Sequence, residues 1–326
     1  MTFPRSWLLT FAFVACHPSL PTRPTPIGVT TTRGAAPLRG TPEADDAAKA
    51  LANASYPSVR AALEAGIRGS HRNPGAADRD KYRHPVETLS FFGIEPTMTV
   101  LDVGPGKGWY TELLAPALAN RGMYIATNLK PPATAVPPSE HHWTDYEGQQ
   151  FDALLQAAPE LYGKVQVIRV NYKAPKLNLD ASVDLVLLMR EVHMMRNWGT
   201  LDTWLREIHR ALKPRGVLGV EEHRASPETN PDDCAKTGYL PEAWVIAKIE
   251  SAGFALAGKS EINANPKDTK DYPEGVWTLP PSFMGGARDR AKYTAIGESD
   301  RMTLRFVKVE PRADAGPGTR AQRCCP

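Results

Sequence analysis

The sequence has few cysteines, little net charge and no long hydrophobic run. Its four cysteines lack the paired spacing of a zinc site, so they predict neither a metal site nor a disulfide framework; they are Cys16, Cys234, Cys324 and Cys325. The formal net charge is only +3, and no run of Lys and Arg is dense enough to indicate a nucleic-acid surface. Nucleic acid is therefore not an expected partner.

The N-terminus has the form of an export signal. A short polar start with one Arg precedes an apolar run from Trp7 to Ala15, which is too short to span a bilayer. The run ends in Phe13-Val14-Ala15-Cys16, which resembles a bacterial lipoprotein signal, in which the Cys is lipidated. We predict an exported protein, periplasmic or anchored to the membrane through lipidated Cys16. The alternatives are an ordinary cleaved signal and a misread start, which would make the protein cytoplasmic.

Composition divides the rest of the chain into three parts. Residues 17–48 are rich in Pro, Thr, Arg and Ala without an apolar period, so they predict a disordered tether. Residues 49–310 have the patterning of one folded domain, and residues 311–326 are predicted to be a disordered tail. The domain organisation is thus a signal over residues 1–16, a tether, one domain and a tail.

Within the domain, predicted strands alternate with predicted helices. Strands are expected at residues 97–103, 122–128, 165–170, 183–189, 217–221, 255–262 and 302–309. Helices are expected at residues 58–65, 86–92, 109–119, 152–158, 201–212 and 240–252, and a tight turn at residues 213–216. This alternation predicts an α/β fold, a doubly wound and mostly parallel sheet with helices on both faces.

A glycine loop joins the first predicted strand to the next helix. It reads Asp102-Val-Gly-Pro-Gly-Lys-Gly108, and such a loop lets a ligand approach the backbone and the helix N-terminus closely. A nicotinamide fingerprint requires a third glycine where this chain has Trp109. The loop therefore disfavours a nicotinamide-dependent oxidoreductase.

These residues resemble the class I S-adenosylmethionine-dependent methyltransferases. The resemblance covers about residues 97–309 and includes the acidic residue before the three glycines and similar patterns at residues 183–189, 212–218 and 240–254. It implies a Rossmann-like sheet of seven strands, S-adenosyl-L-methionine as cofactor and methyl transfer. The chain also looks like a group of predicted bacterial exported methyltransferases, which share Tyr82-Arg83-His84-Pro85 and the Gly-Trp-Tyr ending of the loop.

The resemblance implies a set of cofactor-binding residues. Asn128 and Asn171 stand after the second and third strands, where the family often has carboxylates that accept hydrogen bonds from the cofactor. The full predicted set is Asp102, Gly104, Pro105, Gly106, Gly108, Asn128, Asn171, Arg190 and Tyr82. Tyr82 belongs to a polar segment that is either a lid over the cofactor or a surface loop.

Candidate catalytic residues follow the fourth and fifth strands. Glu191 and His193 follow one strand, and Glu222 and His223 follow the other, and ligands bind beyond the carboxyl ends of such strands. A His oriented by a carboxylate can act as a general base, so His193, His223 and Glu222 are the predicted catalytic residues. The alternatives are structural ion pairs and a divalent metal site, but we expect no metal.

The sequence thus predicts a methyltransferase that acts on an unidentified small molecule. Two alternatives are a non-catalytic S-adenosylmethionine-binding or regulatory protein and, less favoured, a nicotinamide-dependent oxidoreductase. The long segment of residues 263–300 either shapes the substrate pocket or is a solvated loop. Cys234 is expected to be a packing residue.

Overall fold

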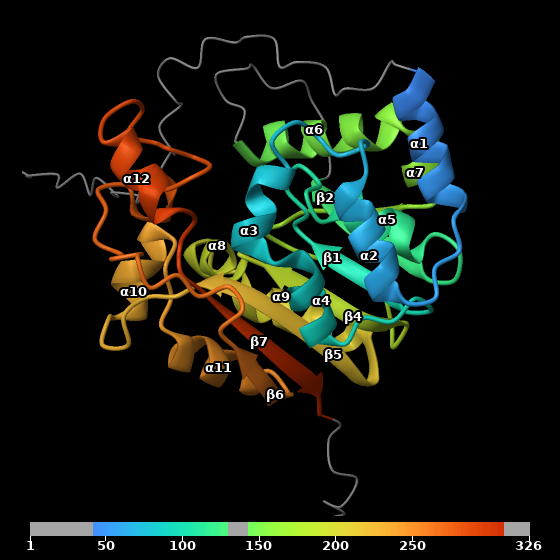
Figure 1. The fold of residues 1–326 in the computed structure, drawn as a ribbon. Coiled ribbons are helices and arrows are strands. Elements are labelled where there is room, and N and C mark those ends of the chain that lie inside the picture. The colour runs from blue at the N-terminus through green and yellow to red at the C-terminus, as the bar shows by residue number, and fades with distance from the viewer. Residues whose placement is uncertain (1–41, 130–142, 310–326) are drawn as a thin grey trace, which may run out of the picture.

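The computed structural model describes residues 42–129 and 143–309 (Figure 1). The predicted signal and Cys16, the predicted tether up to residue 41, and the predicted tail with Cys324 and Cys325 lie outside these residues. Among the described residues, no helix is both long enough and apolar enough to span a membrane.

A single sheet of seven strands forms the centre of the fold, in the order β3-β2-β1-β4-β5-β7-β6. The strands β1 to β5 pair in parallel, whereas β7 runs antiparallel to both β5 and β6. Their bounds are β1 Thr99–Val103, β2 Met123–Leu129, β3 Gln166–Val170, β4 Val183–Met189, β5 Leu212–His223, β6 Phe254–Ser260 and β7 Arg301–Lys308. This arrangement confirms the predicted Rossmann-like, mostly parallel sheet.

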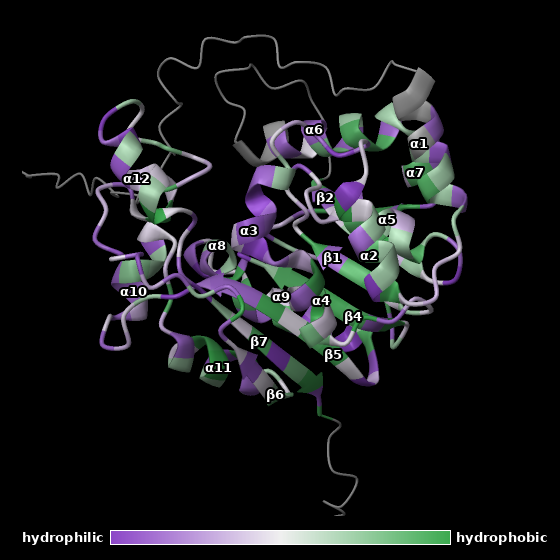
Figure 2. Cartoon of the chain, in the orientation of Figure 1, coloured by the Kyte–Doolittle hydropathy of each residue, from purple (hydrophilic) through white to green (hydrophobic). Residues whose placement is uncertain are grey.

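Helices cover both faces of the sheet, and a separate apolar core lies on each side. One core is covered by α1 (Pro42–Asn53), α2 (Val59–Arg68), α4 (Pro85–Phe92), α5 (Thr111–Leu118), α6 (Trp143–Ala157) and α7 (Pro159–Tyr162). The other is covered by α8 (Val192–Asn197), α9 (Leu201–Ala211) and α11 (Glu242–Glu250). Figure 2 shows that the central strands β1 and β4 are hydrophobic, as expected for strands buried on both faces.

Helix α9 illustrates why these segments form amphipathic helices. Leu201, Trp204, Leu205 and Ile208 recur at helical spacing and are all buried against the sheet.

On the opposite side, Ser58 caps α2 by accepting a hydrogen bond from the backbone N–H of Ala61. The remaining short helices are α3 (Asp80–Arg83), α10 (Pro231–Cys234) and α12 (Arg290–Ile296).

Three predicted boundaries are wrong. Helix α1 begins at Pro42, inside the predicted tether, because its buried Ala48 and Leu51 join the first core. Helix α6 begins at Trp143, well before residue 152. Residues 213–216 form a bulge inside β5 and not a separate turn, because the pairing of β5 with β4 continues on both sides of them and Arg215 adopts a φ of 61°.

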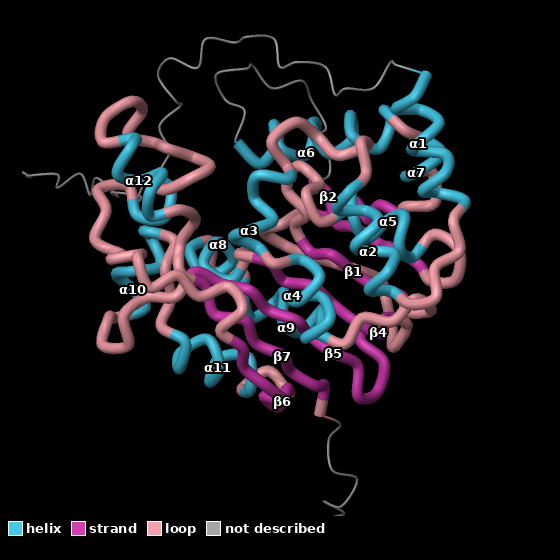
Figure 3. The backbone as a smooth tube through the Cα atoms, in the orientation of Figure 1, coloured by secondary structure: helices cyan, strands magenta, loops and turns pink. Residues whose placement is uncertain are grey.

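The segment between β6 and β7 contributes to the functional end of the sheet. Figure 3 shows loops gathered beside the ends of β5 and β7, where this segment returns to the sheet. Its residues form two small apolar clusters: Val276 and Trp277 pack with Cys234 and Tyr239, and Tyr272, Leu279 and Tyr293 pack together. Cys234 is a buried packing residue, as predicted.

Candidate active site

The glycine loop connects β1 to α5 at the carboxyl end of the sheet. Gly104, Gly106 and Gly108 have φ values of 70°, 58° and 89°, in the left-handed region that other residues rarely adopt. A Cβ atom placed on Gly106 would meet nothing closer than Oε2 of Glu147, at 3.8 Å. The backbone at Gly106 therefore faces open space that a ligand can occupy.

A cleft lies beside this loop, at the carboxyl ends of β1, β2, β3 and β4. It is lined by Gly104, Pro105, Gly106, Thr127, Asn128, Leu129, Glu147, Gly148, Tyr172, Glu191 and Trp198. Thr127 fixes the loop, since its hydroxyl accepts a hydrogen bond from the backbone N–H of Gly104 at 2.9 Å. This lining combines an exposed backbone loop, carboxylates and aromatic rings, and it therefore fits a nucleoside-containing cofactor.

The two predicted asparagines occupy different positions. Asn128 lines the cleft, but its Nδ2 donates to the carbonyl of Gly148 and to Asp152, and its Oδ1 accepts from the backbone N–H of Leu129. These bonds to α6 leave the side chain of Asn128 no free donor for the cofactor. Asn171 is exposed and its Oδ1 accepts from the backbone N–H of Lys173, so it stabilises a local turn.

Asp102 and Gly108 hold the ends of the loop against neighbouring elements of the fold. Asp102 is buried and accepts a hydrogen bond at 2.8 Å from Tyr124, whose hydroxyl also contacts Thr111. Burial raises the pKa of Asp102 to about 6, against the lowering effects of the Tyr124 hydrogen bond and of Arg190. At Gly108, an added Cβ would lie 2.3 Å from Leu154 of α6, so this glycine permits the close packing of that helix.

Tyr82 and Arg190 do not line the cleft. The ring of Tyr82 lies against Gly297, where an added Cβ would meet it at 2.6 Å. Arg190 follows β4 with a φ of 64° and donates from Nη1 to Glu221 at 2.8 Å. Both residues therefore lie with a neighbouring polar cluster, described below.

Sequence reasoning did not assign Glu191 to the cofactor cleft. Its carboxylate lies against the loop, because a Cβ on Gly104 would meet it at 2.7 Å. Burial and the nearby carboxylates of Glu147 and Glu222 raise the pKa of Glu191 well above its ordinary value. The sequence feature that could have placed Glu191 at the cleft is its position two residues after the end of β4, because ligands bind at this end of the sheet.

The three predicted catalytic residues are brought together. Nδ1 of His193 lies 2.9 Å from Oε1 of Glu222, and the carboxylate of Glu222 also accepts the backbone N–H groups of His193 and His223. The rings of His193 and His223 are 5.5 Å apart between centroids. The strand ends after β4 and β5 thus form one site, as the sequence predicted.

The segment of residues 263–300 completes this site. The hydroxyl of Ser299 lies 2.6 Å from Nδ1 of His223, and the ring of Trp277 lies 6.1 Å from that of His193. Burial, His193 and nearby arginines lower the pKa of His223 well below its ordinary value, so His223 is neutral at physiological pH. The segment is therefore a wall of the site and not a solvated loop.

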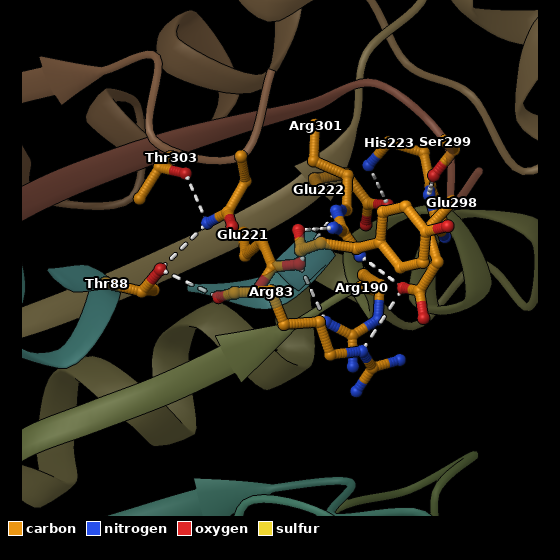
Figure 4. Close-up of polar contacts among 12 residues, drawn as sticks. Arg83, Thr88, Arg190, Glu221, Glu222, His223, Glu298, Ser299, Arg301 and Thr303 are labelled. Carbon is orange, nitrogen blue, oxygen red and sulfur yellow. Dashed lines mark hydrogen bonds and ion pairs between the residues drawn. The ribbon is translucent and has the colours of Figure 1, made fainter. Parts of the chain in front are cut away.

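Four arginines and two glutamates form a polar cluster near His223, and all of them except Arg79 are labelled in Figure 4. Glu221 pairs with Arg190 and Arg301, and Glu298 pairs with Arg79, Arg83 and Arg301. These cations lower the pKa of Glu221 and hold that of Glu298 well below its ordinary value, because each carboxylate is stabilised in its charged form. We call these six residues the arginine cluster.

Among the described residues, one group meets the geometric criterion for a metal site, namely His193, Glu222 and His223. The oxygens of Glu222, however, already accept three hydrogen bonds. Arg190 and Arg301 also lie close enough to lower the pKa of His223, and their charge opposes a second cation. The arrangement therefore favours proton transfer over metal binding.

The fold is that of the class I methyltransferases, and part of the sequence matches a methyltransferase domain. The sheet order with an antiparallel β7 is that of the class I fold, and residues 101–220 match the family described as methyltransferase domain. This match supports an S-adenosylmethionine-dependent methyltransferase with S-adenosylmethionine as its cofactor. A search of curated proteins finds no match.

Several solved structures are similar. An S-adenosylmethionine-dependent methyltransferase from Aquifex aeolicus is 18% identical, with 73% of this chain and 94% of that chain covered and a TM-score of 0.46. The [4+2]-cyclase SpnF is 18% identical, with 70% and 81% covered and a TM-score of 0.48. The 1,6-didemethyltoxoflavin-N1-methyltransferase from Burkholderia thailandensis is 15% identical, with 72% and 80% covered and a TM-score of 0.40.

Proposed function

We propose that the protein methylates an oxygen or nitrogen atom of a small molecule and that His193 is the general base. The observation that carries this proposal is the pair of His193 and Glu222 at the carboxyl ends of β4 and β5, a short distance from the cofactor cleft. Glu191, which lines the cleft, is two residues from His193 in the chain. The cofactor cleft and the proposed base are therefore adjacent.

The hydrogen bonds around Glu222 determine the tautomer of His193. An ionised carboxylate only accepts hydrogen bonds, and Glu222 already accepts two from backbone N–H groups. Nδ1 of His193 therefore donates its proton to Glu222, which leaves the lone pair of Nε2 free. Within the described residues, Nε2 makes no hydrogen bond, so it is available to a substrate.

The proposed residues divide the work of the reaction. S-adenosylmethionine, when bound beside the glycine loop, supplies an electrophilic methyl group. Nε2 of His193 would accept the proton of the substrate O–H or N–H as the bond to the methyl carbon forms and the carbon–sulfur bond breaks, with S-adenosylhomocysteine as the leaving group, and Glu222 would stabilise the resulting imidazolium. Neutral His223, held by Ser299, and Trp277 form the wall that positions the substrate and excludes water.

Binding of the cofactor is tested by calorimetry on the full chain. S-adenosylmethionine and S-adenosylhomocysteine are expected to bind, and NADH is not. A Gly106→Asp variant is expected to lose this binding, because its side chain and charge would enter the open face of the loop. Folded wild-type protein that binds neither adenosyl compound would favour the non-catalytic or repurposed alternatives.

The role of His193 is tested with a labelled methyl group and a panel of phenols, alcohols and amines. We expect His193→Gln to slow transfer to an accepted substrate by about 10² to 10⁴-fold, the usual contribution of a general base. Affinity for S-adenosylhomocysteine should stay unchanged. His209→Gln is the matched control, because His209 is half-buried on α9 and contacts Phe254 and the carbonyl of Val309, away from the site. Equal rates for wild type and His193→Gln would contradict the proposal.

A further inference from the structure

The arginine cluster contains more positive than negative charge. Its four guanidinium groups face two carboxylates, those of Glu221 and Glu298, and most of these side chains are buried. A buried charge without a counter-ion is costly, so a purely structural network would balance its charges. The carboxylates of Asp102 and Glu191 also lie near enough to Arg190 to interact with it, but neither forms an ion pair with the cluster among the described residues, so the cluster can accept an additional anion.

The arginines differ in how fully they are paired. Arg301 is almost completely buried and hydrogen-bonds through both Nη groups, to Glu298 and to the carbonyl of Tyr82, and it also forms an ion pair with Glu221. Arg79 and Arg83, in contrast, each hydrogen-bond to Glu298 through Nε alone. Arg301 is thus the structural member of the cluster.

The unpaired donors belong to three arginines. Among the described residues, neither Nη group of Arg79 or Arg83 makes a hydrogen bond, and Arg190 uses only Nη1. The guanidinium of Arg83 also stacks on the ring of Trp109, 4.7 Å from its centroid, which fixes its plane. Fixed guanidinium groups with free Nη donors match the geometry of a carboxylate or phosphate.

We infer that Arg79, Arg83 and Arg190 form a binding subsite for an oxyanion group of the methyl acceptor, a carboxylate or a phosphate. This inference rests on the proposed methyl transfer, because it names the acceptor as an anionic small molecule. Figure 4 shows Arg83 and Arg190 near Glu298, with Ser299 and His223 beside it. An anion held by the arginines would leave the rest of the substrate to extend toward the histidines.

Two further observations support an anionic ligand. Burial and the neighbouring Arg190, Arg79 and Arg301 lower the pKa of Arg83 to about 9, so the cations repel one another when no anion is bound. Arg190 adopts a left-handed φ of 64°, a strained conformation that is typical of functional positions. The three arginines also lie outside the residues that line the cofactor cleft, which favours the acceptor over the cofactor as the source of the anion.

The inference is tested by calorimetry with the full chain and simple probes. Benzoate and inorganic phosphate represent the two anions, and benzamide is the neutral control. Each titration is done with and without saturating S-adenosylhomocysteine. We expect benzoate or phosphate to bind in both conditions and benzamide to bind at least about tenfold more weakly, since charge-assisted hydrogen bonds are lost. The preferred anion distinguishes a carboxylate from a phosphate acceptor.

Variants identify the residues involved. Arg79→Met, at the more exposed member of the cluster, should weaken anion binding by about tenfold or more, while Arg60→Met, on the exposed face of α2, should leave it unchanged. A second readout needs no variant. The anion should protect Arg79 and Arg83 of the wild-type protein from modification by phenylglyoxal, measured by mass spectrometry.

Three results would overturn the inference. They are the absence of anion binding to folded protein, equal binding of benzamide, and displacement of the anion by S-adenosylhomocysteine, which would assign the arginines to the cofactor carboxylate. None of these results depends on methyl transfer. Binding of the anion without any detectable transfer would in turn contradict the proposed function and not the subsite.

Discussion

At the scale of single residues, Asp102 is an ionisable side chain in a buried position. It precedes the glycine loop, and its carboxylate is buried against Tyr124 and forms no ion pair with any residue that the structure describes. Its pKa rises from 3.8 to about 6, so the ionised form is less stable in the folded protein than in the unfolded chain. Stability is therefore lost as the pH rises from about 4 to about 6.

This shift predicts that Asp102→Asn stabilises the protein at neutral pH. An asparagine keeps the acceptor for Tyr124 and removes the buried charge. The rise in the pKa of Asp102 corresponds to an increase of about 3 kcal/mol in the free energy of unfolding at pH 7. Urea denaturation at pH 7 and pH 4 measures it, and the gain should disappear at pH 4. A destabilised variant at pH 7 would mean that the ionised carboxylate has a favourable partner.

Sequence reasoning located the catalytic candidates better than their partners. His193, Glu222 and His223 follow neighbouring parallel strands, and the rule that such strand ends meet was sufficient to place them together. Ser299 and Glu298 reach the same site from far along the chain, before the antiparallel β7, and no local pattern marks them. The hydrogen bonds that divert Asn128 to α6 also depend on tertiary packing.

At the scale of elements, the contact between α6 and the glycine loop is a tight one. Gly108 has a φ of 89°, and an added Cβ would lie 2.3 Å from Leu154 and 3.3 Å from Phe151. Gly199 also has a positive φ, of 68°, but nothing lies within 4 Å of its Cβ position. A comparison of the two glycines therefore separates the cost of a side chain at a positive φ from the cost of packing it against α6.

We expect Gly199→Ala to cost about 1 to 2 kcal/mol, the price of a left-handed alanine. Gly108→Ala is expected to cost a further ~1 to 3 kcal/mol, because overpacking must displace α6. Thermal or urea unfolding of both variants measures the difference. Equal losses would mean that α6 does not pack closely on the loop, and cofactor affinity would then be unaffected by Gly108→Ala.

The elements that sequence reasoning identified best are those with strong periodicity. The segment of β4, with its continuous apolar run, and α9, with apolar residues at helical spacing, lie where they were predicted. Helix α6 was found only in its second half, where Phe151, Leu154 and Leu155 lie, because its first turns are polar and lack a period. The early start of α1 was missed because a few buried alanine and leucine side chains in a Pro-rich context resemble a tether.

At the scale of the whole molecule, the N-terminal signal predicts where the protein resides. We propose that lipidated Cys16 attaches the chain to a membrane. Expression of the full chain in a bacterium with lipoprotein processing should place it in the membrane fraction. Cys16→Ala should move it to the soluble fraction, and Cys234→Ala, at a buried packing position, should not. Equal distribution of wild type and Cys16→Ala would contradict lipid attachment.

The cofactor site and the wall beside the histidines come from different parts of the chain. The glycine loop, the strand ends and the proposed base lie within or next to residues 101–220, whereas Trp277 and Ser299 come from the segment between β6 and β7. That segment leaves and re-enters the sheet at β6 and β7, on the side farthest from β2 and β3. None of its described residues lines the cofactor cleft. Substitutions in this segment can thus reshape the wall beside His193 and His223, while the glycine loop and the arginines of the proposed anion subsite stay the same.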